Sequence, residues 1–414
     1  MALLERLLDG KIRRGTLTIR RADGSSVTLG APSVGWPDAK LIVKEAGAER
    51  RILLNPRLGL AEAYMDGAVD VEGDDIMGLI ELVRRNNPWE KGGEIGGPKP
   101  FRRTFAKVVR PFQQLNSLAR SRANVAHHYD LSNDFYRLWL DDDMQYSCAY
   151  WANGVETLEQ AQLAKKAHIA AKLDLHPGQR VLDVGCGWGG TALYLNRVAN
   201  VDVLGITLSE EQLKLARERA ERAGVSDRVK FELIDYRDLA RREPQGFDRI
   251  VSIGMFEHVG VPQFETYFRA VANMMKDDGV FLLHTIGRMG KPGSTDAFTR
   301  KYIFPGGYIP ALSETLAASE RVKLIHSDVE NLRLHYARTL RAWYHRVTEV
   351  SEQVVAQYDK RFYRMWRFYL SGATAAFEAG GMCNYQIQYI RNRHTLPVTR
   401  DYLPDTEREL LAKG

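Results

Sequence analysis

The stretch VLDVGCGWGG at residues 181–190 decides the fold of this chain. Val181, Leu182 and Val184 are apolar and favour β structure, as a buried parallel strand requires. Four glycines follow by residue 190, and a helical pattern, TALYLNRVA, comes next. Because glycines at a strand-to-helix turn let the backbone approach a ligand closely, the stretch predicts a binding turn at the end of a buried strand.

The C-terminal part of the chain alternates strand-like and helical runs. Residues 209–224, SEEQLKLARERAERAG, predict a helix with a Ser cap and a terminal glycine. A last strand is expected at 382–392, MCNYQIQYIRN. This alternation predicts an α/β fold with a doubly wound, Rossmann-like parallel sheet. Its other expected strands are RVLDVG (180–185), VDVLGIT (201–207), VKFELID (229–235), FDRIVSIG (247–254) and GVFLLHTIG (279–287).

The length of 414 residues exceeds one ordinary domain and predicts two. Residues 1–90 are expected to form a small α+β domain that ends in the helix IMGLIELVRR. A Gly- and Pro-rich stretch follows, and we expect a basic linker at 91–122. Residues 123–414 then form the larger domain, with a helical, aromatic-rich insertion at about 331–378.

The formal net charge of +6 and the pI near 9.0 suit an anionic partner, either nucleic acid or an anionic lipid surface. The segment 91–122 carries eight basic residues, and apolar residues recur in it at helical spacing. Such a segment either lies on a bilayer surface or is a linker helix packed on its own protein, and both interpretations stay open. No apolar run is long enough to span a membrane, and the N-terminus is a poor signal peptide. Three cysteines, Cys148, Cys186 and Cys383, lack paired spacing, which argues against disulfides and against a zinc site. The expected location is therefore cytoplasmic.

The run GITLSEEQ at 205–212 helps to identify the ligand of the glycine turn. It lacks the acidic residue that a nicotinamide ribose requires at this distance from the turn. Together with Asp183 inside the strand, it resembles the class I S-adenosylmethionine (SAM) methyltransferases. Asp183 and the turn would hold the methionine end of SAM. Thr207 and Gln212 would bind the ribose, and Asp235 and Tyr236 would meet the adenine.

Two of these assignments have structural alternatives. Gln212 alone reads as an exposed helical residue, and Asp235 alone reads as a helix cap. The cofactor-binding residues that the resemblance implies are Tyr146, Ser147, Asp183, Gly185, Cys186, Gly187, Thr207, Leu208, Gln212, Asp235 and Tyr236.

Seven blocks of sequence, in order, resemble the cyclopropane-fatty-acyl-phospholipid synthase family. The match begins near residue 60 and reaches the C-terminus. The N-terminal domain favours the bacterial phospholipid type over the shorter mycolic-acid type, which lacks it. The blocks are HHYDLSNDFYRLWLDDDMQYSCAYW (127–151), VLDVGCGWGG, GITLSEEQ, GMFEHVG (254–260), LLHTIG (282–287), KYIFPGGYIP (301–310) and HYARTLRAW (335–343).

The resemblance implies a reaction in which a cis alkene of an unsaturated phospholipid attacks the SAM methyl group. The resulting carbocation needs an apolar, water-poor site with π faces. A bound bicarbonate ion then removes a proton, and a cyclopropane ring closes. The residues implied around the bicarbonate are Glu257, His284, Tyr336, Cys148 and Ile286, of which Cys148 and Ile286 would act through backbone groups.

Three other functions are compatible with parts of the sequence. A related SAM-dependent lipid methyltransferase would leave a methyl or methylene branch in place of the ring. A soluble small-molecule methyltransferase would not need the N-terminal domain or the basic linker. A nucleic-acid-binding module would leave the catalytic blocks unexplained, so we expect no nucleic-acid partner. We expect peripheral association with the inner face of the membrane, and the sequence leaves open whether the chain forms a homodimer.

Overall fold

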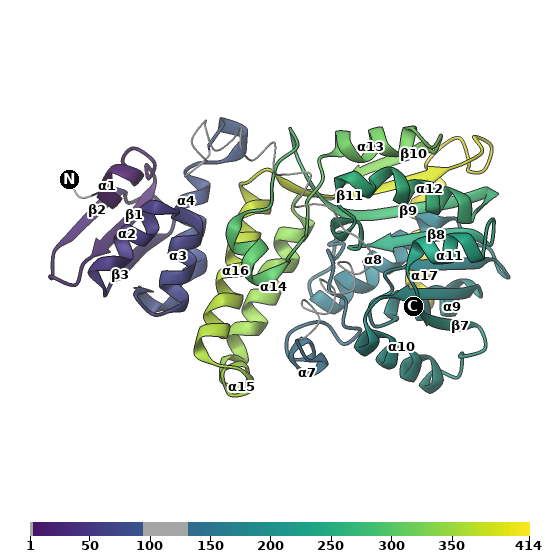
Figure 1. Cartoon of the computed structure of the whole chain (residues 1–414), viewed down its shortest axis with the longest axis horizontal. Coiled ribbons are helices and arrows are strands. Elements are labelled where there is room, and N and C mark those ends of the chain that lie inside the picture. The colour runs from purple at the N-terminus through teal and green to yellow at the C-terminus, as the bar shows by residue number, and fades with distance from the viewer. Residues whose placement is uncertain (1–2, 94–130) are drawn as a thin grey trace. The chain divides into compact units, whose positions relative to one another are not determined.

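The computed structural model describes residues 3–93 and 131–414 (Figure 1). These residues form two compact units. The first unit joins the N-terminal residues to Thr295–Pro305 and Ala337–Met382. The second unit contains the described residues from 131 to Ser294, together with Gly306–Tyr336 and Cys383–Gly414. Most of the basic linker expected at 91–122 lies outside the described residues.

The second unit is built on a seven-stranded sheet of order β10-β11-β9-β8-β5-β6-β7. The run from β9 to β7 is parallel, as the alternation of the sequence predicted. β10 and β11 pair antiparallel, so the sheet is mixed and not wholly parallel. The strands are β5 (Arg180–Val184), β6 (Asp202–Thr207), β7 (Val229–Leu233), β8 (Phe247–Ile253), β9 (Met275–Arg288), β10 (Ile325–Asn331) and β11 (Met382–Ile390).

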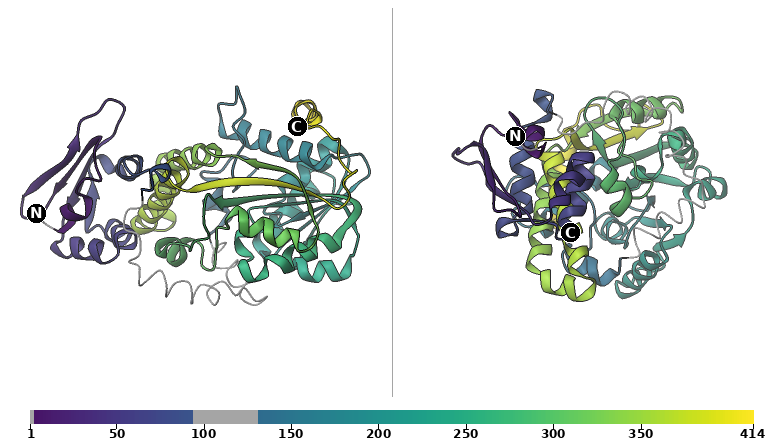
Figure 2. Two further views of the ribbon diagram at one scale, coloured as in Figure 1. Left: turned by 90° about the horizontal axis from the view of Figure 1, so that it is seen from above. Right: turned by 60° about the vertical axis from the view of Figure 1, so that its left-hand side comes forward.

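Helices cover both faces of this sheet (Figure 2). Side chains of β5 alternate between two core clusters, with Leu182 and Val184 in one and Val181 in the other. The first cluster includes side chains from α11 (Tyr236–Arg242), α12 (Phe264–Met274) and α13 (Leu312–Glu320). The second includes side chains from α8 (Leu158–Leu173), α9 (Gly190–Ala199), α10 (Glu210–Arg222) and α17 (Tyr402–Lys413). The short helix α7 (Asn133–Arg137) precedes them. This is the α/β methyltransferase fold that the sequence predicted.

The first unit contains a small four-stranded sheet of order β2-β1-β3-β4. Buried and half-buried residues alternate along β1, so one face of the sheet packs on helices. The small α+β domain expected in the N-terminal residues is therefore present. Its elements are α1 (Leu3–Leu8), β1 (Gly15–Arg20), β2 (Ser26–Ala31), β3 (Asp38–Val43), α2 (Ala46–Leu54), α3 (Pro56–Met65), β4 (Val69–Val71) and α4 (Ile76–Arg85).

The aromatic-rich segment expected at about 331–378 is helical, as α14 (His335–Glu349), α15 (Ser351–Gln357) and α16 (Lys360–Glu378). α16 packs on α3 and α4, where the Tyr64 and Phe368 rings lie 6.3 Å apart. The contacts thus group most of this segment with the N-terminal residues, although it follows β10 in sequence. The domain boundaries drawn from the sequence remain predictions. Among the described residues, no helix has the length and apolar character needed to cross a bilayer.

Candidate active site

The glycine turn lies directly after β5. Gly185 and Gly187 adopt φ values of +83° and +54°, a region that disfavours other residues. A Cβ atom on Gly185 would lie 2.8 Å from Cβ of Met255, so packing alone requires glycine there. A Cβ atom on Gly187 would meet no heavy atom within 4 Å. The backbone at Gly187 therefore borders open space, as a turn that receives a ligand would.

The side chain of Asp183 lies in the core beside this turn. Its relative exposure is 1%, and its Oδ2 atom has no hydrogen-bond partner among the described residues. Burial raises the pKa of Asp183 to about 7. A buried carboxylate oxygen without a partner is costly unless a ligand supplies a donor or a cation. The geometry suits the ammonium group at the methionine end of SAM.

Lys165 of α8 was not expected from the sequence. Its side chain is fully buried, and Nζ donates to Oε1 of Gln145 at 2.5 Å and to Oγ of Ser147 at 2.9 Å. Burial lowers the pKa of Lys165 to about 8. The lysine thereby fixes the segment that carries Ser147, one of the expected cofactor residues. No sequence signal marks this role, because a lysine within a helix usually reads as solvent-exposed.

The expected ribose-binding residues come together at the carboxyl end of β6. Oγ1 of Thr207 donates to Oε1 of Gln212 at 3.0 Å and accepts the backbone N–H of Ser209 at 3.1 Å. Ser209 caps α10. Gln212 is 5% exposed, which excludes the interpretation as an exposed helical residue. Leu208 lies between them and is half-buried.

The expected adenine-binding residues have protein partners of their own. The Asp235 carboxylate caps α11 by accepting the N–H of Arg237 at 2.9 Å, and it also accepts from the guanidinium at 2.7 and 2.8 Å. The structural alternative, a helix cap, is therefore present at Asp235. Tyr236 is buried, with its ring 5.3 Å from that of Tyr267. Contact of either residue with adenine remains a prediction.

The segment 141–150 carries the aromatic ring of Tyr146 and the thiol of Cys148, both of which were expected in the site. The Tyr146 ring lies 5.4 Å from that of Tyr136 and 5.6 Å from that of Trp139. Cys148 is 1% exposed, and its Sγ atom donates to the carbonyl of Ala149 at 3.4 Å. Burial raises the pKa of Cys148 well above its usual range, so the thiol is protonated and not a nucleophile. Burial likewise raises the pKa of the Cys186 thiol in the glycine turn.

Glu257 and Ile286 meet at the ends of β8 and β9. Glu257 lies in the short 3-10 turn Phe256–His258, and its Oε1 atom accepts the backbone N–H of Ile286 at 2.6 Å. Its Oε2 atom is buried and has no partner among the described residues. Burial raises the pKa of Glu257 to about 7. The carboxyl group is therefore held on one side and free to exchange a proton or accept a hydrogen bond on the other.

His284 lies on β9 with 1% exposure. Its Nδ1 atom is 3.1 Å from Nε2 of Gln386 on β11, and its own Nε2 atom has no partner in the described part of the chain. Burial lowers the pKa of His284, so the ring is neutral. With the amide oriented in this way, Nδ1 accepts and Nε2 carries the proton. Tyr336, near the start of α14, is 6% exposed.

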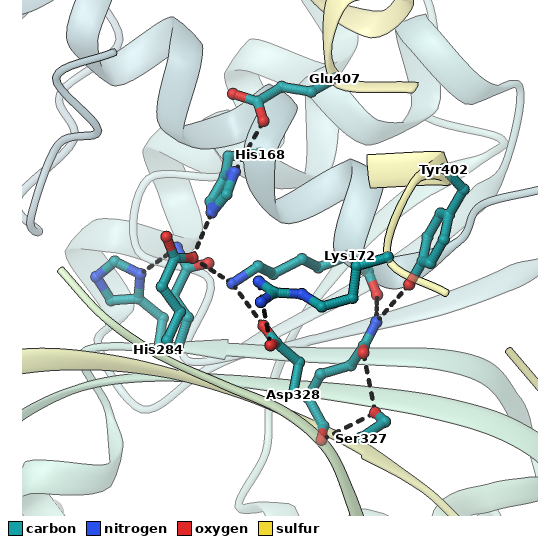
Figure 3. Close-up of polar contacts among 11 residues, drawn as sticks. His168, Lys172, His284, Ser327, Asp328, Tyr402 and Glu407 are labelled. Carbon is teal, nitrogen blue, oxygen red and sulfur yellow. Dashed lines mark hydrogen bonds and ion pairs between the residues drawn. The ribbon is translucent and has the colours of Figure 1, made fainter. Parts of the chain in front are cut away.

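A charged network lies beside His284 (Figure 3). His168 bridges two carboxylates, with 2.7 Å to Glu330 and 3.0 Å to Glu407 of α17. Lys172 is fully buried and binds Glu330 at 2.5 Å. The Tyr150 ring stacks on that of His168 with centroids 4.1 Å apart. The sequence did not reveal this network, whose members are separated by up to 239 positions.

Comparisons with known proteins identify the family of this chain. The family described as mycolic acid cyclopropane synthetase matches residues 116–387, and a domain of unknown function matches residues 4–88. The cyclopropane-fatty-acyl-phospholipid synthase of Escherichia coli K12 is 40% identical over 357 residues, which are 86% of this chain and 89% of that protein. A probable fatty acid methyltransferase of Pseudomonas putida is 37% identical over 399 residues, covering 93% and 95% of the two chains.

Two solved structures are similar to this chain in fold and in sequence. A mycolic acid cyclopropane synthase complexed with SAH and CTAB has a TM-score of 0.61 and 34% identity, covering 65% of this chain and 97% of that one. A cyclopropane synthase from Mycobacterium tuberculosis has the same TM-score at 32% identity, with the same coverage. The chain therefore belongs to the cyclopropane fatty acid synthase family of SAM-dependent methyltransferases.

Proposed function

We propose that the protein adds a methylene group from SAM across the cis double bond of an unsaturated acyl chain in membrane phospholipid, forming a cyclopropane ring. The similarity to the Escherichia coli phospholipid synthase, which covers 86% of this chain and 89% of that protein, supports this substrate class. In the balanced reaction, the sulfonium–methyl bond breaks, the methyl carbon bonds to one alkene carbon, and one methyl proton leaves as the second carbon–carbon bond forms.

The residues around the glycine turn would hold SAM. Asp183 offers a carboxylate oxygen without a partner to the ammonium group, and Gly187 leaves room for close approach. Thr207 and Gln212 offer a preassembled hydroxyl–amide pair to the ribose. When bound, SAM supplies an electrophilic methyl group.

The residues that would surround the base fit a bicarbonate ion. Oε2 of Glu257 can accept its hydrogen, and Nε2 of His284 can donate to its charged oxygens. The family resemblance assigns the Tyr336 hydroxyl group as a third donor. The backbone N–H of Ile286 binds Glu257, so we assign Ile286 to orienting that carboxylate. When bound, bicarbonate would supply the proton acceptor for ring closure.

The observation that carries the proposal is the buried Glu257 carboxyl group, fixed at Oε1 and without a partner at Oε2 among the described residues. Glu257→Gln keeps its shape and removes its charge. We expect turnover to fall by about 10² or more while SAM affinity stays near wild type. Glu265→Gln, at a partly exposed position of α12 where the carboxylate pairs with Arg269, is the matched control and should leave turnover unchanged.

Mass spectrometry of phospholipid incubated with protein and SAM reads the product directly. A ring-containing lipid is expected from the wild type. If Glu257→Gln reduces SAM affinity as much as turnover, Glu257 belongs to the cofactor pocket and this mechanism fails. The second candidate function is methyl or methylene branching, favoured by the fatty acid methyltransferase names among the relatives. A branched product from the wild type would select it.

We also propose that the protein works at the inner membrane surface as a peripheral enzyme, since its substrate would reside there. The basic segment 91–122 is the expected contact with lipid. Assembly as a homodimer stays a prediction.

A further inference from the structure

The first unit contains a surface pocket of about 470 Å³ whose lining includes no residue of the candidate active site. Its wall is formed by Lys44 after β3, by Asp66 and Gly67 after α3, and by the first turn of α16. These segments are far apart in sequence, and all of them belong to the first unit. The N-terminal half of this wall falls in the domain of unknown function.

The lining of this pocket is strongly cationic. It contains four basic residues against the single carboxylate of Asp66, namely Lys44, Lys360, Arg361 and Arg364. Asp70, which is outside the lining, pairs with Lys44 and Arg364. Counting Asp70 with the lining still leaves two positive charges in excess. A pocket with such an excess attracts an anion and concentrates it locally.

Arg364 forms the floor of the pocket, and hydrogen bonds hold its guanidinium group in place. It is 8% exposed, and its guanidinium donates to Oδ1 of Asp70 at 2.5 Å and to the carbonyl of Tyr64 at 2.8 Å. Gly67 approaches the same guanidinium, since a Cβ atom there would lie 3.5 Å from Nη1. The charge is thus held in place before any ligand arrives, which reduces the entropy lost on binding.

The rim of the pocket is formed by Lys360 and Arg361, which are exposed. Arg361 is oriented by Asp66, with Nε and Oδ1 2.9 Å apart. Lys360 forms no ion pair with any described residue. Both begin α16, a helix of 19 residues whose N-terminus adds partial positive charge. Asp359 caps that helix through the N–H of Phe362. Because the Asp359 carboxylate already occupies this helix end, the rim offers an incoming anion mainly the Lys360 ammonium group, a cation that pairs with no described carboxylate.

We propose that this pocket binds the phosphodiester headgroup of an anionic phospholipid. The ligand class rests on the proposed function, which places the protein among membrane lipids. The pocket volume lies within the range of small-molecule sites and exceeds what a lone inorganic ion requires. It can therefore accept a phosphate group together with the glycerol and polar group attached to it. The first unit would anchor the enzyme on its substrate surface in this way.

The test measures binding of the full-length protein to phosphatidylglycerol vesicles, with phosphatidylcholine vesicles as the uncharged comparison. Lys360→Glu reverses an exposed charge without breaking an ion pair to any described residue. It should weaken vesicle binding at least fivefold, because one basic residue near an anionic surface typically contributes roughly 1 kcal/mol. Lys230→Glu makes the same change at an exposed position of β7 in the second unit and should alter binding less than about twofold. Equal losses in the two variants would overturn the proposal, because binding would then follow overall charge alone.

A competition experiment distinguishes a lipid headgroup from free inorganic phosphate as the ligand of the pocket. Glycerophosphoglycerol, the headgroup without acyl chains, should displace the wild type from vesicles but hardly affect residual binding by Lys360→Glu. If inorganic phosphate competes equally well, the site is a free-anion site and the lipid assignment is wrong. Ring formation at saturating vesicles should keep its wild-type kcat in Lys360→Glu. A wild type that makes no ring would refute the proposed function, whereas the binding measurements would still decide the pocket.

Discussion

Replacing Asp183 by Asn should make the ligand-free protein more stable at high pH and should lower its affinity for SAM. Burial raises the pKa of Asp183 from 3.8 to about 7, so ionised Asp183 opposes folding. Each pKa unit corresponds to about 1.4 kcal/mol. The penalty therefore reaches about 4 kcal/mol at a pH of about 8.5 but stays under about 2 kcal/mol near pH 5, where the folded carboxyl group is protonated.

The direction in which stability changes with pH follows from the number of protons bound in the folded and unfolded states. Between the two pKa values the folded state holds a proton at Asp183 that the unfolded state has lost, so wild-type stability falls as pH rises toward 7. The amide introduced by Asp183→Asn cannot ionise, and any cost of burying it is the same at every pH. Wild type should therefore lose roughly 3 kcal/mol more than Asp183→Asn between about pH 5 and about pH 8.5.

Urea unfolding of the ligand-free proteins at these two pH values measures the difference, and calorimetry measures SAM binding. Asp183→Asn should bind SAM at least tenfold more weakly, a loss of about 1.4 kcal/mol. Asp227→Asn, at an exposed position before β7, is the matched control and should change neither quantity. Parallel pH profiles for wild type and Asp183→Asn would refute the reasoning, because Asp183 would then not be an ionising group with a raised pKa.

Two further predictions concern the turn and the charged network. Gly187→Ala and Gly224→Ala both place a side chain at positive φ in open space, so each should cost about 1–2 kcal/mol of stability; calorimetry should show at least a tenfold loss of SAM affinity only for Gly187→Ala, and equal affinities would place the cofactor elsewhere. Burial would lower the pKa of His168, but hydrogen bonds to two carboxylates raise it above 6.5, so its stabilisation is complete below pH 6.5 and disappears as pH rises through the raised value. His168→Gln should therefore destabilise the protein by about 3 kcal/mol near pH 6 and by clearly less near pH 9.5, as measured by urea unfolding, and an equal loss at both values would contradict the pairing.

The inner strands of the parallel part of the large sheet could be predicted because they are buried on both faces. β5, β6, β8 and β9 each contain a short apolar run followed by a turn or a helix signal, whereas the outer strand β7 alternates buried with less buried residues. β10 was missed for the opposite reason. It lies at the edge of the sheet, and its sequence IHSDVEN buries only Asp328, so neither alternation nor an apolar run marks it. The antiparallel pair β10–β11, and with it the mixed sheet, was therefore not expected.

Some residues of the candidate site could be predicted from the sequence for the same reason, and others could not. Glu257 and the Thr207–Gln212 pair follow strands that the sequence identifies, so position in the fold pointed to them. Lys165 could not be found in this way. It lies on α8, which is buried on nearly all sides, and its role depends on a tertiary contact with Ser147. A charged residue within a helix normally predicts a solvated face, and that rule fails where two layers of protein enclose the helix.

Three of the unpartnered polar atoms in the described part of the second unit belong to the candidate site and have one physical explanation in common. Oδ2 of Asp183, Oε2 of Glu257 and Nε2 of His284 are each buried without a hydrogen bond to the described residues. Leaving a buried polar atom unpaired costs about 1–3 kcal/mol, so three of them are a considerable burden for a folded chain. The two carboxyl groups also have a pKa near 7 because burial opposes their ionised forms. Ligands that donate to the two carboxylates and accept from the imidazole would remove these costs on binding. Since a group that binds only the folded state stabilises it, SAM and bicarbonate would each stabilise the fold through the same atoms that position them for reaction.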